Sequence, residues 1–238
     1  MPSILLTRPA PAADRFARSL RARFGAQIRI VISPLLSPRL LSPAVPAGPF
    51  AAVVFTSETG VAGYRQVSAD TRIPAWCVGN RTAAAAREAG FETRSAEGDL
   101  DALTEAIRHS RLTGPLLYAR GRETAGNLEE RLRSLNIAVT EVVVYEQQAR
   151  PLLPMASALL AEDHLVVVPL FSPRTAALFC AEPAVRMRSA PLLIAALGPA
   201  VASACTAAQA QQTVCAARPD AEAMLDVIAS LLATATQP

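Results

Sequence analysis

A segment that occurs twice constrains this chain more than any other feature of its sequence. The stretch "ILLTRPAPAADRFARSLRARFGAQIRIVI" aligns with "LLYARGRETAGNLEERLRSLNIAVTEVVV". Arg8 and Leu20 in the first copy are separated by the same number of residues as Arg120 and Leu132 in the second. We name this segment A. Its recurrence indicates that the chain was built by duplication.

A second repeated segment, B, follows each copy of A. "VVFTSETGVAGY" matches "VPLFSPRTAALF", "CVGNRTAAAAREAG" matches "ALGPAVASACTAAQ", and "GDLDALTEAI" matches "PDAEAMLDVI". Asp99 and Asp220 open the last pair, at positions where helix N-caps belong. The order A, B, A, B indicates two similar domains, with chance similarity between apolar strands as the alternative.

Strand-like and helix-like patterns alternate within the segments. In the first A, "SILLTR" is an apolar strand candidate and "IRIVIS" is the next one. Between them Phe16, Leu20 and Phe24 recur at helical spacing, and Gly25 ends the predicted helix. This alternation predicts an α/β fold with parallel sheets, and 238 residues suffice for one large or two small domains.

The four segments allow two assemblies. The domains could be consecutive, 1 to about 110 and about 112 to 238, or the first A could pair with the last B around an inserted domain. Proline-punctuated stretches follow both A segments and resemble crossings between domains, which favours the second assembly. The predicted bounds are then residues 1–35 with 150–238 for domain 1, 40–144 for the inserted domain 2, and linkers near 34–42 and 143–152.

Composition excludes several classes of protein. Hydrophobic residues make up 51% of the chain, which is globular rather than disordered. The uncharged stretch 189–217 contains Gly198-Pro199, so we interpret it as strand, turn and helix rather than a membrane span. The N-terminus lacks the pattern of a signal peptide, which predicts a cytoplasmic protein. The cysteines, none in a C-x-x-C pair, are predicted to be reduced core residues: Cys77, Cys180, Cys205 and Cys215.

The net charge of +3 is too small and too dispersed for a nucleic-acid-binding face. Arginine supplies the basic residues, which suits planar recognition of carboxylate or phosphate, although a GC-rich genome explains it equally well.

Familiar catalytic motifs are incomplete in this sequence. "GRETAGNL" has the glycine spacing of a phosphate loop, but Asn127 stands where lysine is required. "FTSETG" lacks the glycines of a nucleophile elbow, since Phe55 and Thr59 occupy their positions. The two histidines, His109 and His164, are too few for a histidine-rich metal site, so no metal site is predicted.

Polar residues, most of them small, and glycines cluster where predicted strands end. Carboxyl ends of parallel strands share one edge of a sheet, where ligands bind in open α/β folds. Helix N-termini at that edge suit carboxylates without a cofactor. Simple helix capping is the alternative for each residue taken alone. The set comprises Thr7, Arg8, Thr56, Ser57, Gly79, Asn80, Thr82, Arg120, Gly121, Ser172 and Gly198.

An ordered series of short motifs resembles the uroporphyrinogen-III synthase family across nearly the whole chain. The series is "ILLTRP", "VVFTSETGV", "CVGNRTAAAAREAGF", "LLYARGRETAGNLEERL", "VVVYE", "LFSPRTAALF", "ALGPAVASA" and "PDAEAMLDVI". The resemblance implies two flavodoxin-like parallel-sheet domains, joined by a two-stranded β-ladder, with the active cleft between them. It also implies that hydroxymethylbilane, which bears eight carboxylates, loses water and cyclises without a cofactor to uroporphyrinogen III, with inversion of its last ring.

The same resemblance assigns the candidate site residues. Tyr145 matches the family's tyrosine in "VYE" and is expected to assist departure of the terminal hydroxyl, because a neutral phenol can donate a proton. A half-buried structural tyrosine is the alternative. In the "GPAVASA" turn, Ala200 and Val201 replace frequent hydroxyl residues, which leaves backbone N–H groups near Gly198. Expected substrate-binding residues are Ser57, Asn80, Thr82 and Ser172 as hydrogen-bond donors, Arg8 and Arg120 as carboxylate partners, and Gly198.

Partners follow from the same implied function. Hydroxymethylbilane is the expected ligand of a monomer, with a possible transient contact to the upstream deaminase and no nucleic acid or membrane. Two other functions stay open: a noncatalytic two-lobed protein that binds a small anionic ligand, and a two-lobed transferase that uses a nucleotide sugar.

Overall fold

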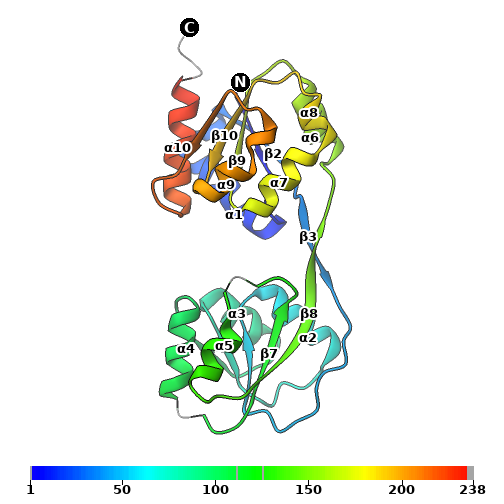
Figure 1. Ribbon diagram of the computed structural model, residues 1–238, viewed down its shortest axis with the longest axis vertical. Helices are drawn as coiled ribbons and strands as arrows, with labels where there is room; N and C mark the ends of the chain where they lie inside the picture. The colour runs from blue at the N-terminus through cyan, green and yellow to red at the C-terminus, as the bar shows by residue number, and fades with distance from the viewer. Residues whose placement is uncertain (1, 111, 125, 235–238) are drawn as a thin grey trace. The chain divides into compact units, whose positions relative to one another are not determined.

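The chain forms two compact units in the computed structural model, which describes residues 2–110, 112–124 and 126–234. Unit 1 combines Met1–Ser37 with Gln148–Pro238, and unit 2 is the intervening Pro38–Gln147. Each unit contains its own sheet (Figure 1). Each also has its own hydrophobic clusters, so the units are described separately below.

The sheet of unit 1 is parallel throughout, with the strand order β11-β10-β9-β1-β2. Strand β1 is an interior strand, between β9 and β2, although it comes first in the chain, and all of its residues are buried. Its side chains alternate between the two faces of the sheet, as a pleated strand requires. The strands are β1 (Ser3–Leu6), β2 (Arg29–Ile32), β9 (Val166–Leu170), β10 (Leu192–Ala196) and β11 (Gln212–Cys215).

Helices cover both faces of this sheet. Ile4 and Leu6 share one hydrophobic cluster with residues of α1 and α10, whereas Leu5 shares the other with α6, α7 and α9. Phe16 and Leu20 of α1 are buried as the helical spacing predicted, and Gly25 follows the helix with φ 61°. The helices are α1 (Ala10–Phe24), α6 (Pro154–Ala161), α7 (Pro173–Ala181), α8 (Pro183–Arg186), α9 (Pro199–Ala204) and α10 (Ala221–Thr234), with 3₁₀ turns η1 (Gly25–Gln27) and η2 (Thr206–Ala208).

Unit 2 has a six-stranded sheet in the order β3-β8-β7-β4-β5-β6. Val53 and Phe55 pack with α2 and α3 on one face, and Ala52 and Val54 pack with α4 and α5 on the other. The elements are β3 (Leu36–Leu40), β4 (Ala52–Phe55), α2 (Glu58–Val67), β5 (Ala75–Cys77), α3 (Asn80–Glu88), β6 (Thr93–Ser95), α4 (Leu100–His109), β7 (Leu116–Gly121), α5 (Leu128–Ser134) and β8 (Val139–Ala149).

Apart from β3, the two sheets have the same arrangement of strands but differ in chain order. In unit 1 the strands of the first A, β1 and β2, pair with those of the last B through β1 and β9. In unit 2 the strands of the first B precede those of the second A, and β4 pairs with β7. One sheet is therefore a circular permutation of the other in the order of its A and B halves.

Strand β3 lies beside β8 at the end of the unit 2 sheet. The Arg150 N–H donates to the Leu35 carbonyl at 2.9 Å, and the Leu41 N–H donates to the Val144 carbonyl at 2.9 Å. Residue numbers rise on one strand while they fall on the other, so the two strands are antiparallel. Both strands contain the point at which the chain passes from one unit to the other.

The predicted helix caps are confirmed, and one prediction about the cysteines is wrong. Asp99 accepts hydrogen bonds from the Asp101 and Ala102 N–H groups, and Asp220 accepts one from Ala223. Cys215, predicted in the core, is exposed because the edge strand β11 turns it outward, whereas the other three cysteines are buried.

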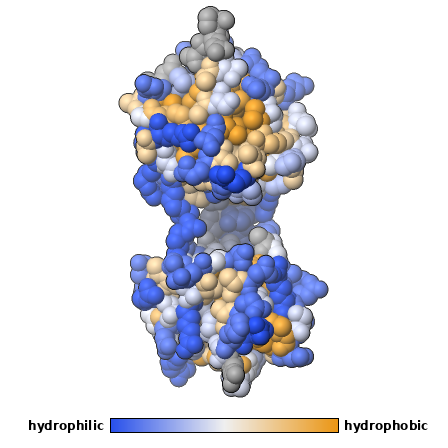
Figure 2. All heavy atoms as spheres, turned by 90° about the vertical axis from the view of Figure 1, so that its left-hand side faces the viewer, coloured by the Kyte–Doolittle hydropathy of each residue, from blue (hydrophilic) through white to orange (hydrophobic). Residues whose placement is uncertain are grey.

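The uncharged stretch 189–217 forms β10, α9, η2 and β11, as interpreted from sequence. Among the residues described, no helix is long and apolar enough to cross a membrane. Figure 2 shows hydrophilic side chains over much of the visible face of each unit, interrupted by hydrophobic ones.

Candidate active site

Unit 2 contains a pocket of about 490 Å³ at the carboxyl edge of its sheet. Thr56 and Ser57 reach it from the end of β4, and Gly121 reaches it from the end of β7. Strands β4 and β7 are neighbours in the sheet. The chain continues from β4 to β5 and from β7 to β8, in opposite directions along the strand order, so the pocket lies at the topological switch point. Ligands of open α/β sheets bind at such points.

Tyr145 faces Ser57 across this pocket. The Tyr145 Oη and Ser57 Oγ atoms are 3.0 Å apart, a hydrogen bond in which either hydroxyl can donate. Ser57 is also the N-cap of α2, because its Oγ accepts a hydrogen bond from the Gly60 N–H at 3.0 Å. The helix terminus therefore fixes the serine hydroxyl, and the serine hydroxyl orients the phenol.

The Tyr145 ring lies directly against Gly121. A Cβ atom at position 121 would come within 2.6 Å of the ring carbon Cζ, so no other residue fits there without moving the ring. The register between β7 and β8 shifts between Arg120 and Gly121, which places Gly121 opposite Tyr145. The Arg122 N–H then donates to the Tyr145 carbonyl at 2.8 Å. This bulge and the glycine together set the position of the phenol.

A second tyrosine lines the same pocket. The Tyr118 hydroxyl lies 3.1 Å from the Thr56 Oγ1, and burial raises the pKa of Tyr118, so the phenol stays protonated at neutral pH. Thr56 lies at the sheet edge as its sequence position predicts, whereas Tyr118 was not among the predicted site residues. The available signal was one polar-tipped residue within the otherwise apolar strand "LLYA".

Carboxylates rather than guanidinium groups complete the lining of this pocket. Asp99 and Glu123 line it, and no arginine among the described residues does. Asp99 is held by its role as the N-cap of α4, and Glu123 accepts a hydrogen bond from the Gln147 N–H at 3.3 Å. The pocket thus combines hydroxyl groups with negative charge, which suits a group that becomes cationic.

Arg120 is bonded within unit 2. Its guanidinium donates to Glu141 at 2.7 Å and to the Gly121 carbonyl at 2.9 Å, with both charged side chains about one-fifth exposed. These bonds brace the bulge that positions Tyr145. The role of Arg120 as a partner of substrate carboxylates stays a prediction.

Asn80 and Thr82 lie in the first turn of α3, at the carboxyl end of β5. Asn80 is exposed and Thr82 is buried, and neither is among the residues that line the pocket. The prediction that both donate hydrogen bonds to substrate is untested.

Unit 1 places its predicted site residues at the carboxyl edge of its own sheet. The Arg8 guanidinium stacks on the Phe171 ring, 3.8 Å from the centroid. Ser172 caps α7 by accepting from the Thr175 N–H at 3.2 Å, and Gly198 precedes α9 in an extended conformation. Proline stands in the first turn of α1, α7 and α9, which removes N–H donors that sequence analysis expected at this edge.

The two units therefore differ in what they offer a ligand. In unit 2, neither α2 nor α3 has proline in its first turn, whereas α1, α7 and α9 of unit 1 do. Within the described ranges, no group of three or more His, Cys, Asp or Glu side chains could hold a metal ion.

A parallel α/β protein with a hydroxyl-lined pocket at a sheet switch point defines the class to which this chain belongs. Residues 16–226 match the family model described as uroporphyrinogen-III synthase HemD, so the chain belongs to the uroporphyrinogen-III synthase family. The family resemblance stated from sequence motifs is thereby confirmed. No curated protein matched the sequence.

Solved structures match over nearly the whole chain. Uroporphyrinogen-III synthetase from Helicobacter pylori 26695 matches with a TM-score of 0.64 and 18% identity, over 97% of this chain and 100% of that one, which supports the fold described above. A mutant uroporphyrinogen III synthase from the extremely thermophilic bacterium Thermus thermophilus matches with a TM-score of 0.48 and 13% identity, over 98% and 100%.

Proposed function

We propose that this chain catalyses the reaction of its family, the cyclisation of hydroxymethylbilane to uroporphyrinogen III with loss of water and inversion of the last pyrrole ring. The match to the family model over residues 16–226 supports the reaction. One structural observation carries the proposal for the site: a tyrosine hydroxyl held by Ser57 and Gly121 opens into the switch-point pocket of unit 2. The enzyme is then a hydro-lyase that needs no cofactor.

Tyr145 is the proposed general acid. Its phenol donates a proton to the terminal hydroxyl of the substrate as the C–O bond breaks, which releases water and leaves an azafulvene-like cation. The last ring then attacks through its substituted α-carbon, which becomes a spiro centre. The bond from this carbon to its original bridging methylene breaks, and the methylene rejoins the ring at the other α-carbon, which inverts the ring. The proton lost from that second carbon restores the phenol. General acid catalysis of this kind typically contributes ~10² to 10⁴-fold. Ser57 orients the phenol and can share its proton.

The carboxylates of Asp99 and Glu123 give this pocket a second proposed role. A cation that forms beside them is stabilised by their negative charge, and this stabilisation is stronger in a partly desolvated pocket than in water. The acidic lining also disfavours the acetate and propionate groups of the substrate. We therefore propose that the reactive end of the substrate, rather than its carboxylates, occupies the pocket.

The substrate carboxylates require other partners. Arg8 and Arg120 are the proposed ones, in agreement with the need to hold a flexible polyanion in one folded geometry. The other proposed substrate-binding residues are Ser57, Asn80, Thr82 and Ser172 as hydrogen-bond donors, together with Gly198.

The finer architecture implied by the family resemblance belongs to the same proposal. It comprises two flavodoxin-like domains, the β3–β8 ladder as their linker, and an active cleft between the domains. The strand order of unit 1, read in chain order, is that of flavodoxin, and unit 2 has the permuted order, which supports this assignment. A cytoplasmic monomer that receives its substrate from the upstream deaminase is also proposed.

Product analysis tests the function. Hydroxymethylbilane is generated in situ, and the uroporphyrinogen isomers are oxidised and separated. Free hydroxymethylbilane closes to the symmetrical isomer, so we expect isomer III with the native protein and the symmetrical isomer with heat-denatured protein. Accumulation of only the symmetrical isomer in the presence of native protein contradicts the proposal and leaves the two alternatives, a noncatalytic binding protein and a transferase that uses a nucleotide sugar.

A further inference from the structure

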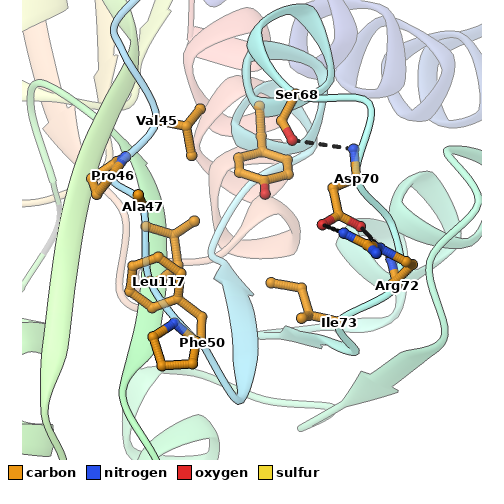
Figure 3. A pocket seen from close by; sticks show the side chains of 12 residues that line it. Val45, Pro46, Ala47, Phe50, Ser68, Asp70, Arg72, Ile73 and Leu117 are labelled. Carbon is orange, nitrogen blue, oxygen red and sulfur yellow. Dashed lines mark hydrogen bonds and ion pairs between the residues drawn. The ribbon is translucent and has the colours of Figure 1, made fainter.

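A second pocket in unit 2 lies at the opposite end of α2 from Ser57. Its volume is about 450 Å³, within the range typical of small-molecule sites. Val45 and Phe50 line it from the segment before β4, Ile73 from the segment before β5, and Leu117 from the start of β7. Because these positions precede or begin their strands, the pocket lies at the amino edge of the sheet (Figure 3).

One wall of this pocket is a short proline-rich strap, residues 42–50. Pro46 and Pro49 fix its backbone, and it is anchored at both ends. The Gln66 side chain donates to the Ser42 hydroxyl at 3.1 Å, and the Ala51 N–H donates to the Pro115 carbonyl at 2.9 Å. A strap held in this way keeps the apolar Val45 and Phe50 side chains across from Ile73, as Figure 3 shows.

Tyr64 brings an unpartnered hydroxyl to this pocket. Its side chain is only 3% exposed, and its ring packs edge-on against Phe55, with centroids 5.8 Å apart. Within the part of the chain that the structure describes, no protein group forms a hydrogen bond with the Tyr64 hydroxyl. The hydroxyl oxygen is not among the fully buried polar atoms that lack a partner, so it is open to the pocket and can form a hydrogen bond with a molecule there.

Ser68 supplies a second donor. Its Oγ accepts a hydrogen bond from the Asp70 N–H at 3.2 Å, which leaves the hydroxyl proton able to donate. The charges at the rim neutralise each other, because Arg72 binds both carboxylate oxygens of Asp70 at 2.9 Å. The pocket therefore presents apolar walls, two hydroxyl groups and a compensated pair of charges.

We propose that this pocket binds a planar, uncharged aromatic molecule that carries an oxygen acceptor, such as an aryl ketone or lactone. The aromatic ring lies between the strap and the side chains of Ile73 and Leu117, and the oxygen accepts hydrogen bonds from Tyr64 and Ser68. A polyanionic tetrapyrrole does not fit this chemistry. The site is thus distinct from the candidate active site, and its test is independent of the proposed reaction.

Methyl NMR with two small probes tests this proposal on the full chain. Acetophenone is planar and has a carbonyl oxygen, whereas ethylbenzene has a similar shape without the oxygen. We expect saturable shifts at the methyl groups of Val45, Ile73 and Leu117 with acetophenone, and about fivefold weaker binding of ethylbenzene, the usual effect of one hydrogen bond. The variant Tyr64→Phe should reduce this preference, since only Ser68 can then donate to the carbonyl oxygen, and it should not harm the fold, because the hydroxyl that it removes has no protein partner.

Tyr118→Phe is the matched control, since it removes a phenol from the other pocket of the same unit and should leave the preference unchanged. Three results would each overturn the proposal: no saturable shift at these methyl groups, saturable shifts only elsewhere in the chain, or an undiminished preference for acetophenone in Tyr64→Phe.

Discussion

The hydroxyl of Tyr145 is placed by contacts that depend on single atoms of its neighbours. The Ser57 Oγ forms a hydrogen bond with the Tyr145 hydroxyl, and Gly121 has no side chain to displace the Tyr145 ring. Neither neighbour is adjacent to Tyr145 in sequence. The phenol can therefore be changed with little effect on packing, while small changes around it should alter catalysis.

The variant Tyr145→Phe removes only the proposed acid. We expect kcat to fall by about 10²-fold, the lower end of the usual range, because the substrate also loses water without help. Stability should fall by no more than about 1 kcal/mol, the net contribution of one hydrogen bond. Steady-state assays and urea unfolding measure both quantities, and an unchanged kcat would remove the acid role.

Ser57→Ala should have a milder effect on kcat, roughly three- to tenfold, because the phenol remains but loses its orienting partner. Loss of the α2 cap should also cost about 1 kcal/mol in urea unfolding. Ser57→Thr should restore both, since threonine keeps the hydroxyl.

Asp220→Ala is the control for the Ser57 variants, because it removes a comparable cap from α10, which belongs to the other unit. It should lower stability without changing kcat. An equal loss of kcat in Asp220→Ala would show that the Ser57 effect reflects stability alone, and complete inactivity of Ser57→Ala would show that catalysis depends on this serine far more than proposed.

The position of a residue in the fold could be predicted from the sequence where the role of that residue is local. Ser57 and Ser172 could be placed at helix starts because a capping hydroxyl acts on its own helix. Neither Tyr118 nor the contact between Gly121 and the Tyr145 ring was predicted, since both depend on the register between β7 and β8. Spacing along one strand does not determine a bulge in its pairing with another.

At the scale of elements, Glu146 of β8 connects three strands of unit 2. It accepts hydrogen bonds from Arg39 of β3, at 2.5 Å from Nη2, and from Arg122, which follows β7, at 2.9 Å. These two guanidinium groups lower the pKa of Glu146 from its ordinary value of 4.5. A carboxylate of this kind stabilises the fold above pH 4.5, and the stabilisation is lost as the pH falls through the lowered pKa.

The variant Glu146→Gln should therefore unfold at lower urea concentration than the parent at pH 7, because glutamine cannot pair with both arginines as an ion. The difference should shrink as the pH falls below 4.5 and disappear at lower pH. Glu88→Gln, an exposed change on α3, should show no such difference at pH 7. A difference between Glu146→Gln and the parent that is independent of pH would contradict the ionic origin.

Helices with strong periodicity could be predicted from the sequence. The loss of N–H donors from prolines in their first turns was not predicted. The helix over Phe16 and Leu20 is present because its apolar face recurs at helical spacing and Gly25 ends it. The prolines that begin α7 and α9 were visible in the sequence, but their effect on ligand binding appears only when both helices are placed at one sheet edge. The exposure of Cys215 likewise depends on β11 being an edge strand.

At the scale of the whole molecule, chain order determines which part can fold alone. Unit 2 is one continuous segment with a hydrophobic cluster on each face of its sheet, and its length is within the usual range of a domain. Unit 1 is assembled from two segments, and its interior strand β1 comes from the shorter one. The spacing of the repeats left both assemblies open, because local periodicity is the same whichever A pairs with whichever B.

We accordingly expect residues 38–147 to fold when expressed alone. Trp76, the single tryptophan of the chain, is 5% exposed in β5 and reports on this unit. Its fluorescence should follow a cooperative urea transition in the fragment, as in the full chain. A fragment whose Trp76 emission is already that of an exposed indole in buffer would contradict the independence of unit 2.

Residues 148–238 alone should not fold, because β9 then lacks β1 and the cluster around α10 lacks Phe16 and Leu20. Adding a peptide of residues 1–37 should restore helical circular dichroism and a cooperative transition, since it supplies β1, α1 and β2 together. Folding of 148–238 without the peptide would mean that β1 is dispensable, although it lies between β9 and β2 in the sheet and every one of its side chains is buried. Exposing that much apolar surface along β9 should cost more than a domain of this size can lose, so complementation by the peptide is the expected outcome.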